Sequence, residues 1–239
     1  MNSAHPDWDT ALITGKVNLY YFTGTIQDSL LIINKDGSYS LNIKRSYKRA
    51  LDESPLPAIY QMKSYRDIAQ RDGPELGNTY IEAELLPYFL VEKLRNVFQI
   101  QSLGSLDNMI RQVRSVKSPY ELYWMEASGK KHDHLLTEIV PSLLREGMSE
   151  AEFMGELSNQ MFKNGYHGLT RFSRFQSEVM VGQIGFGTNS LYPTNFDGPG
   201  GARGNSAAVP AAADPKRLLK KGDLVFVDIG FGINGYHSD

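Results

Sequence analysis

The sequence predicts an α/β domain over residues 1–112, followed by an α+β domain over residues 113–239. Strand-like and helix-like segments alternate in the N-terminal half, which is typical of an α/β domain. Two helix starts with complete capping signals, at Ser118 and Ser149, open the second part. Two apolar strand patterns and a turn signal then lead to Asp239, so helices come first and strands later.

Composition excludes several classes of protein. The 239 residues are 41% hydrophobic and 22% charged, enough for one large or two modest cores. The net charge of −2 gives no field that would attract nucleic acid or an anionic membrane, so we expect neither as a partner. With no cysteine, no signal-peptide pattern and no apolar run long enough to span a bilayer, we expect a cytoplasmic protein.

The N-terminal part begins with β-favouring segments. Residues 11–24 and 28–34 are apolar and rich in β-branched and aromatic residues, so we expect strands there. The turn signal at Asp36-Gly37 and the return segment 39–44 predict a hairpin.

Two helices are expected later in this part. Residues 45–54 have helical composition. In residues 85–98, apolar side chains recur every three or four positions and predict one buried helix face, made by Leu86, Phe89, Leu90, Leu94 and Phe98.

Two capped helices open the second part. Ser118 and Glu121 form a capping box around Pro119, and Ser149 and Glu152 form a second one. The first helix should bury Leu122, Met125, Leu135, Leu136 and Ile139, and the second Phe153, Leu157 and Met161, with Gly165 as its stop. The segment 192–214, rich in Gly, Pro, Asn and Ala, is either a linker or the lining of a pocket.

The last stretch places two acids in a strand–turn–strand pattern. Residues 223–229 read as a strand with Asp228 among apolar residues, and the return strand ends at Asp239. A loop of Ile233-Asn234 sets the two acids directly opposite each other, about 5 Å apart at Cβ. A loop of Asn234-Gly235 makes them diagonal neighbours, roughly 7–8 Å apart. Both registers put the acids on one face, because side chains alternate along a strand.

Two close carboxylates on a partly buried face repel each other and lose solvation, so shared protons or cations must compensate. A pair of divalent metal ions about 3.5–4 Å apart fits such spacing. The alternative is an acid beside the turn and a second acid facing solvent.

The stretch "GDLVFVDIGFGINGYHSD" resembles the metal-binding hairpin of the pita-bread metallopeptidases, the family of prolidase, Xaa-Pro aminopeptidase, methionine aminopeptidase and creatinase. Its pattern, G-D-x-V-x-x-D-x-G followed by G-Y-x-x-D, is matched by Gly222, Asp223, Val225, Asp228, Gly230, Gly235, Tyr236 and Asp239. Residues 113–128 resemble the opening of the family's catalytic domain, and residues 11–54 resemble the N-terminal domain of the prolidase and creatinase branch. The resemblance implies an α/β creatinase/prolidase-like domain followed by a partial α+β pita-bread domain.

The resemblance also implies roles. Asp228 matches a ligand of one metal ion, and Asp239 matches the ligand that bridges two. In an intact relative, two divalent ions (manganese, cobalt or zinc) act as Lewis acids while water attacks a scissile carbonyl of a small, peptide-like substrate. A homo-oligomer is expected as well, because a strand pair that ends at Asp239 leaves a strand edge unpaired and an apolar face uncovered, in addition to any dimer that the family forms.

This chain departs from the pattern in two ways. The family's later ligands, a His and two Glu, have no counterpart here, so no catalytic set is complete. No His lies between His167 and His237, where the peptidases carry a substrate-binding His. His237 shares the face of Asp239 and is a possible catalytic residue, whereas His132 and His134 are two positions apart on a helix and should not bind one metal together.

Three interpretations remain. The chain is a fragment of a prolidase or Xaa-Pro aminopeptidase-like dinuclear-metal hydrolase that acts on peptide or amide bonds and is inactive alone. It is a non-catalytic pita-bread-type binding module. Or it is half of a split or recoded enzyme. A Cys or Ser hydrolase is excluded, since there is neither a Cys nor a G-x-S-x-G turn.

Overall fold

The computed structural model describes residues 1, 5–172, 178–194 and 200–239. The chain forms two compact units, Met1–Val116 and Lys117–Asp239, and each is described by itself. The predicted boundary, between residues 112 and 113, lies four residues before the observed one. In the part of the chain that is described, no helix combines the length and the apolar character needed to cross a membrane.

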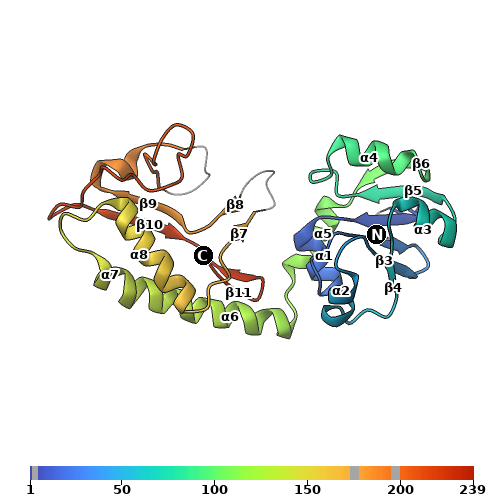
Figure 1. Cartoon of the computed structure of the whole chain (residues 1–239), viewed down its shortest axis with the longest axis horizontal. Helices are drawn as coiled ribbons and strands as arrows, with labels where there is room; N and C mark the ends of the chain where they lie inside the picture. Colours follow the sequence, from blue (N-terminus) through green and yellow to red (C-terminus); the bar gives the residue numbers. More distant parts are fainter. Residues whose placement is uncertain (2–4, 173–177, 195–199) are drawn as a thin grey trace. The chain divides into compact units, whose positions relative to one another are not determined.

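The first unit is built on a six-stranded sheet with strand order β4-β3-β2-β1-β5-β6 (Figure 1). Strands β1, β5 and β6 are mutually parallel, β3 and β4 are parallel, and β2 is antiparallel to both its neighbours. The strands are β1 (Thr10–Ile13), β2 (Ser29–Asn34), β3 (Tyr39–Ile43), β4 (Ile59–Gln61), β5 (Glu75–Ile81) and β6 (Gln99–Ser105).

Helices cover both faces of this sheet. One apolar cluster joins the sheet to helices α1, α2 and α5, and a second cluster joins the opposite face to α3 and α4. The helices are α1 (Lys16–Thr23), α2 (Tyr47–Glu53), α3 (Tyr65–Asp72), α4 (Tyr88–Arg95) and α5 (Asp107–Ser115). The prediction of an α/β domain is confirmed.

One predicted strand is wrong. Residues 16–23, which belong to the β-favouring segment 11–24, form α1 instead. The helix buries Leu19 against the sheet and ends at Gly24, whose φ of 74° suits a left-handed C-cap. Packing of one apolar side onto the sheet outweighs the weak strand preference of its Val, Tyr and Phe residues.

The other N-terminal predictions hold in part. The hairpin at Asp36-Gly37 is confirmed, with Gly37 at φ 87°. Helix α4 is confirmed, but Phe89 is 77% exposed and was wrongly placed on its buried face. The helix begins only at Tyr88 and ends at Arg95, so the buried Leu86 lies before it and the buried Phe98 beyond it.

The second unit opens with the two predicted helices. Helix α6 (Pro119–His134) continues through a π-helical turn (Leu135–Ile139) into α7 (Val140–Leu143), and α8 (Glu150–Lys163) follows. Both capping boxes are present, and α8 stops before Gly165, which has φ 93°. On the first helix, Leu122 and Leu136 are exposed rather than buried. Leu136 lies within the π turn, whose wider spacing changes which side chains face the core.

The strands of the second unit form three two-stranded pairs. These are β7 (Thr170–Arg171) with β8 (Glu178–Val179), β9 (Gly182–Phe186) with β10 (Val225–Ile229), and β11 (Phe231–Ile233) with β12 (Tyr236–Ser238). A 3-10 turn, Gly187–Leu191, follows β9. Figure 1 shows α6 lying along the hairpin of β11 and β12, which it contacts. The core lies between the helices and the inner sides of β9, β10 and β11.

A buried acid at the start of α8 holds this unit together. Glu150 is 0% exposed and accepts hydrogen bonds from Phe186 N at 2.7 Å and Asp214 N at 3.0 Å. It therefore ties β9 and the end of the long loop to the helix. Burial raises the pKa of Glu150 above its ordinary value, although both backbone donors oppose the shift.

We predict that Glu150→Ala destabilises the second unit by about 2–4 kcal/mol, since two buried N–H groups lose their acceptor. Urea unfolding followed by a probe in this unit would measure the change. Glu156→Ala in the same helix is the control, because Glu156 only makes an exposed ion pair with Arg145 and should cost little. Equal losses in the two variants would contradict this role of Glu150.

The same residue predicts a pH dependence. Because its pKa is raised by folding, the folded chain holds the Glu150 proton more tightly than the unfolded chain does. This stabilisation is fully present below the unfolded pKa of about 4.3 and is lost as pH rises through the higher folded value. Glu150→Ala should remove this component of the pH profile, which unfolding curves between about pH 4 and 8 would reveal.

Candidate metal centre

The terminal hairpin adopts the second of the two predicted registers. Asn234 and Gly235 both have positive φ, 51° and 85°, as a two-residue turn of type I′ requires. Phe231 therefore pairs with Ser238, and Asp239 follows opposite Gly230. The strand is broken at Gly230, so β10 pairs with β9 and only β11 pairs with β12, which the sequence did not predict.

The hairpin has an inner and an outer face. Ile229 and Phe231 are buried in the core and mark the inner face. Because side chains alternate, Asp228, His237 and Asp239 belong to the outer face. The alternation thus places the two acids and His237 on one side, and the charge of Asp239 is close enough to raise the pKa of Asp228.

Asp228 is a half-buried residue with one carboxylate oxygen that lacks a hydrogen-bond partner. Its Oδ2 is buried and has no hydrogen-bond partner in the described part of the chain, and the same holds for Oε1 of Gln183, the residue directly opposite on β9. While Asp228 is ionised, its oxygen and the Gln183 oxygen are both acceptors and cannot form a hydrogen bond with each other. Burial, and after it the charge of Asp239, raise the pKa of Asp228. A cation at this face would relieve both effects.

A pair of histidines lies beside the acids. His167 Nε2 is 2.9 Å from His237 Nε2, which is also 3.3 Å from the Leu169 carbonyl oxygen. Gly235 N donates to His167 Nδ1 at 3.2 Å, which leaves the His167 proton on Nε2 and pointing to His237. Burial lowers the pKa of both imidazoles.

Sequence reasoning missed His167. Its imidazole fits only because position 232 is Gly: a Cβ there would lie 2.4 Å from His167 Cε1. The available signal was the segment "GYHGL", where Gly165 and Gly168, both at φ 93°, bracket the histidine in an irregular loop. A single histidine in a loop is weak evidence of function. The contact of His167 with the hairpin is stronger evidence, but it cannot be read from the sequence.

The inner side of the hairpin is held by a small polar network. Ser238 Oγ lies 3.2 Å from both Ser128 Oγ and His132 Nδ1, and Ser128 Oγ donates to Phe231 O at 2.7 Å. Burial lowers the pKa of His132, and the charge of Asp239 opposes this shift. His134 is exposed and takes no part, so the expectation that His132 and His134 do not form a joint site agrees with their positions.

The long loop contacts the outer face. Gln183 Nε2 donates to Thr194 Oγ1 at 3.1 Å, and Gly200 lies so close to the Phe226 ring that a Cβ would be 2.2 Å from it. These contacts favour the pocket-lining interpretation over a linker. Residues 195–199 of this loop lie outside the described residues.

The residues present fit part of a site for divalent cations. Carboxylate oxygens are the ligands that hard divalent ions prefer, and an unpartnered buried Asp228 Oδ2 supplies one. Among the described residues, however, no group of three or more His, Cys, Asp or Glu side chains could hold a metal ion. Asp228 and Asp239 alone make an incomplete ligand set.

Two family models match the chain. Residues 4–116 match the creatinase/prolidase N-terminal domain, and residues 124–239 match metallopeptidase family M24. Together they cover nearly all of it, and the chain belongs to the creatinase/prolidase branch of metallopeptidase family M24. Divalent metal ions are implied for intact members of this family.

Individual relatives agree with this. An uncharacterized peptidase of Staphylococcus haemolyticus is 25% identical over 98% of this chain and 61% of the relative, and an Xaa-Pro dipeptidase of Pyrococcus furiosus is 24% identical over 97% and 58%. The chain thus spans about 60% of the length of these relatives.

Solved structures share the fold. The prolidase from Pyrococcus furiosus has a TM-score of 0.76 at 23% identity, covering 98% of this chain and 65% of that one. An Xaa-Pro dipeptidase from Bacillus anthracis has a TM-score of 0.78 at 20% identity, covering 100% and 61%. The creatinase/prolidase-like domain followed by part of a pita-bread domain is confirmed.

We predict that Asp228→Asn stabilises the metal-free chain. The substitution removes the repulsion by Asp239 and offers an N–H donor to the unpartnered Gln183 oxygen. A gain of about 1 kcal/mol would raise Tm by about 2–4 °C in calorimetry without divalent ions. Asp133→Asn, an exposed acid on α6, is the control and should leave Tm unchanged. A lower Tm in Asp228→Asn would show that the carboxylate has a partner after all.

Proposed function

We propose that this chain is part of a dinuclear-metal hydrolase of the prolidase and Xaa-Pro aminopeptidase type. Residues 1–112 are its N-terminal domain and residues 113–239 the first part of its catalytic domain. Asp228 is a ligand of one divalent ion and Asp239 a ligand shared by two, with manganese, cobalt or zinc as candidates. The observation that carries the proposal is the buried, unpartnered Oδ2 of Asp228 on the same face as Asp239.

The chain's own residues have distinct tasks in this proposal. When bound, the metal ions would act as Lewis acids toward a peptide or amide carbonyl. Asp228 and Asp239 hold them, and Gln183 borders that face. His237 stands beside Asp239 and is proposed to contact the substrate, while His167 fixes the orientation of the His237 ring through the bond between their Nε2 atoms.

The outer face differs from that of a typical proline-peptide hydrolase. No His lies between His167 and His237, and Thr194 contacts Gln183 in the loop before the hairpin. We therefore propose peptide or amide bonds in small substrates, without a requirement for proline. A homo-oligomeric state and a cytoplasmic location belong to the same proposal.

The metal proposal predicts a weak, local Mn²⁺ site. Two carboxylates give affinity nearer about 1 mM than 1 μM, since most of the ligand set is lacking. Added Mn²⁺ should broaden the NMR signals of residues around 183, 228 and 237 first, by paramagnetic relaxation. Asp228→Asn and Asp239→Asn should abolish this pattern, whereas Asp133→Asn should keep it. Broadening that is the same in all variants would contradict the assigned ligands.

The 239-residue chain by itself should not hydrolyse dipeptides. With Mn²⁺, Co²⁺ or Zn²⁺ added, amino-acid release from Leu-Pro and Leu-Leu should stay at the background rate, because two ligands cannot hold a dinuclear centre in place. Chromatography of the released amino acids would measure this. Metal-dependent turnover that disappears in Asp239→Asn would show that the two acids suffice.

A non-catalytic binding module is the second candidate. The lack of a His between His167 and His237, where the peptidases carry a substrate-binding His, is compatible with a protein that binds but does not hydrolyse. If Mn²⁺ leaves the signals near Asp228 and Asp239 unchanged, this candidate replaces the hydrolase proposal.

A further inference from the structure

The first unit contains a cavity of about 400 Å³, a size typical of small-molecule sites. It lies at the carboxyl ends of the parallel strands β1 and β5 and reaches the start of β2. Its lining combines apolar and polar side chains, namely Thr14, Gly15, Lys16, Leu19, Ile26, Gln27, Asp28, Ser29, Tyr65, Leu85, Pro87 and Leu90.

The strand connections explain why a cavity forms there. After β1 the chain turns to α1 on one face of the sheet, and after β5 it turns to α4 on the opposite face. Two adjacent parallel strands whose connections leave on opposite sides open a crevice at their carboxyl ends, the usual ligand site of open α/β sheets. The cavity occupies this crevice, with α1 on one side and the segment before α4 on the other.

A buried acid binds the backbone of two residues that line the cavity. Glu82, 0% exposed, accepts hydrogen bonds from Thr14 N and Gly15 N at 2.7 Å and from Asn18 Nδ2 at 2.6 Å. Backbone N–H groups at this position bind phosphate in many nucleotide-binding sheets. Here a carboxylate of the chain already occupies them, so a phosphate or nucleotide would meet a negative charge.

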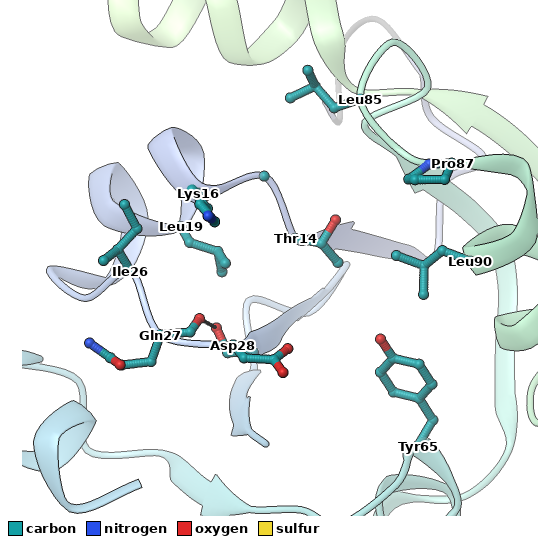
Figure 2. A pocket seen from close by; sticks show the side chains of 12 residues that line it. Thr14, Lys16, Leu19, Ile26, Gln27, Asp28, Tyr65, Leu85, Pro87 and Leu90 are labelled. Atoms are coloured by element: carbon teal, nitrogen blue, oxygen red, sulfur yellow. Dashed lines mark hydrogen bonds between the residues drawn. The ribbon is translucent and has the colours of Figure 1, made fainter. Parts of the chain in front are cut away.

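The polar groups left to a ligand are of both signs. Figure 2 shows the Asp28 carboxylate and the Tyr65 hydroxyl turned toward the middle of the cavity. Among the described residues, the Tyr65 hydroxyl has no hydrogen-bond partner, and Asp28 has only a loose ion pair, 3.8 Å long, with the exposed Arg45. Lys16 lies on the α1 side and makes no ion pair in the described part of the chain.

Apolar groups line two sides of the cavity. Leu19 and Ile26 line the α1 side, and Leu85, Pro87 and Leu90 line the opposite side (Figure 2). A ligand that satisfies all of these groups carries an ammonium for Asp28 and Tyr65, a carboxylate for Lys16, and an apolar side chain.

We propose that this cavity binds a small zwitterion with an apolar side chain, such as a free aliphatic amino acid. The site lies within the first unit and does not depend on the metal centre or on hydrolysis, so failure of the proposed function leaves it untouched.

The probe is L-leucine, titrated into the full 239-residue chain and followed by two-dimensional NMR of the backbone amides. Signals of residues 14–16, 26–29 and 85–90 should shift and saturate together. Leucinamide, which lacks the carboxylate, and 4-methylpentanoate, which lacks the ammonium, should each bind at least about tenfold more weakly, the loss of one charge-assisted contact.

Variants assign the two charges separately. Asp28→Asn should lower the affinity for leucine and leucinamide about tenfold and leave the affinity for 4-methylpentanoate unchanged. Lys16→Met should lower the affinity for leucine and 4-methylpentanoate about tenfold and leave the affinity for leucinamide unchanged. Asp52→Asn and Lys48→Met, both exposed on α2, are the matched controls and should bind leucine normally. Both pocket side chains reach the surface, so their loss should not unfold the unit.

Three results would overturn the proposal. The first is the absence of saturable shifts with leucine. The second is equal weakening by the pocket variants and the α2 controls. The third is a preference for inorganic phosphate, seen as shifts of the Gly15 and Lys16 amide signals with phosphate but not with leucine. Such shifts would mean that Glu82 does not prevent phosphate from binding at the start of α1.

Discussion

The alternation of side chains along residues 225–239 is the constraint on which the candidate metal centre depends. Ile229 and Phe231 must enter the core, and this forces Asp228 and Asp239 to the other side of the same short segment. Gly230 breaks the strand between them, so one part pairs with β9 and the other forms its own hairpin. Helix α6 supports that hairpin from within, through Ser128, His132 and Ser238.

Glu82 and Glu150 differ from Asp228 in their hydrogen-bond partners. Glu82 and Glu150 are fully buried, and each accepts at least two backbone hydrogen bonds from segments distant in sequence. They connect elements of the fold and leave little capacity for a ligand. Asp228 is different, because its buried Oδ2 has no such donor and its charge faces a second carboxylate. This contrast, rather than burial alone, separates the candidate ligand from structural acids.

The same contrast bears on the cavity of the first unit. Its position at the crevice of an open sheet would suit a phosphate, but Glu82 has taken the backbone donors that phosphate would need. The groups proposed to bind a ligand are the Asp28 carboxylate, the Lys16 ammonium and the Tyr65 hydroxyl, beside apolar side chains of the same lining. The fold offers the place for a ligand, and individual side chains decide its chemistry.

Local signals in the sequence determined much of the fold. The capping boxes at Ser118 and Ser149 and the Asp36-Gly37 turn predicted their elements correctly, because each is made by residues within four positions of one another. The alternation of side chains along a strand also predicted that Asp228 and Asp239 share one face of the hairpin. Where packing over longer distances competes, local preference failed: α1 was predicted as strand, and Phe89 was placed inside.

Tertiary structure alone decided the rest. The choice between two hairpin registers depended on which residues of the turn adopt positive φ, and the pairing of β10 with β9 joins segments some forty residues apart. The contact between His167 and His237 spans 70 positions, and the crevice beside Lys16 and Asp28 exists because two neighbouring strands send their helices to opposite faces. The spacing of apolar residues in the sequence indicates whether a segment forms a helix or a strand. Which distant helices and strands contact one another depends on how their apolar faces are buried together.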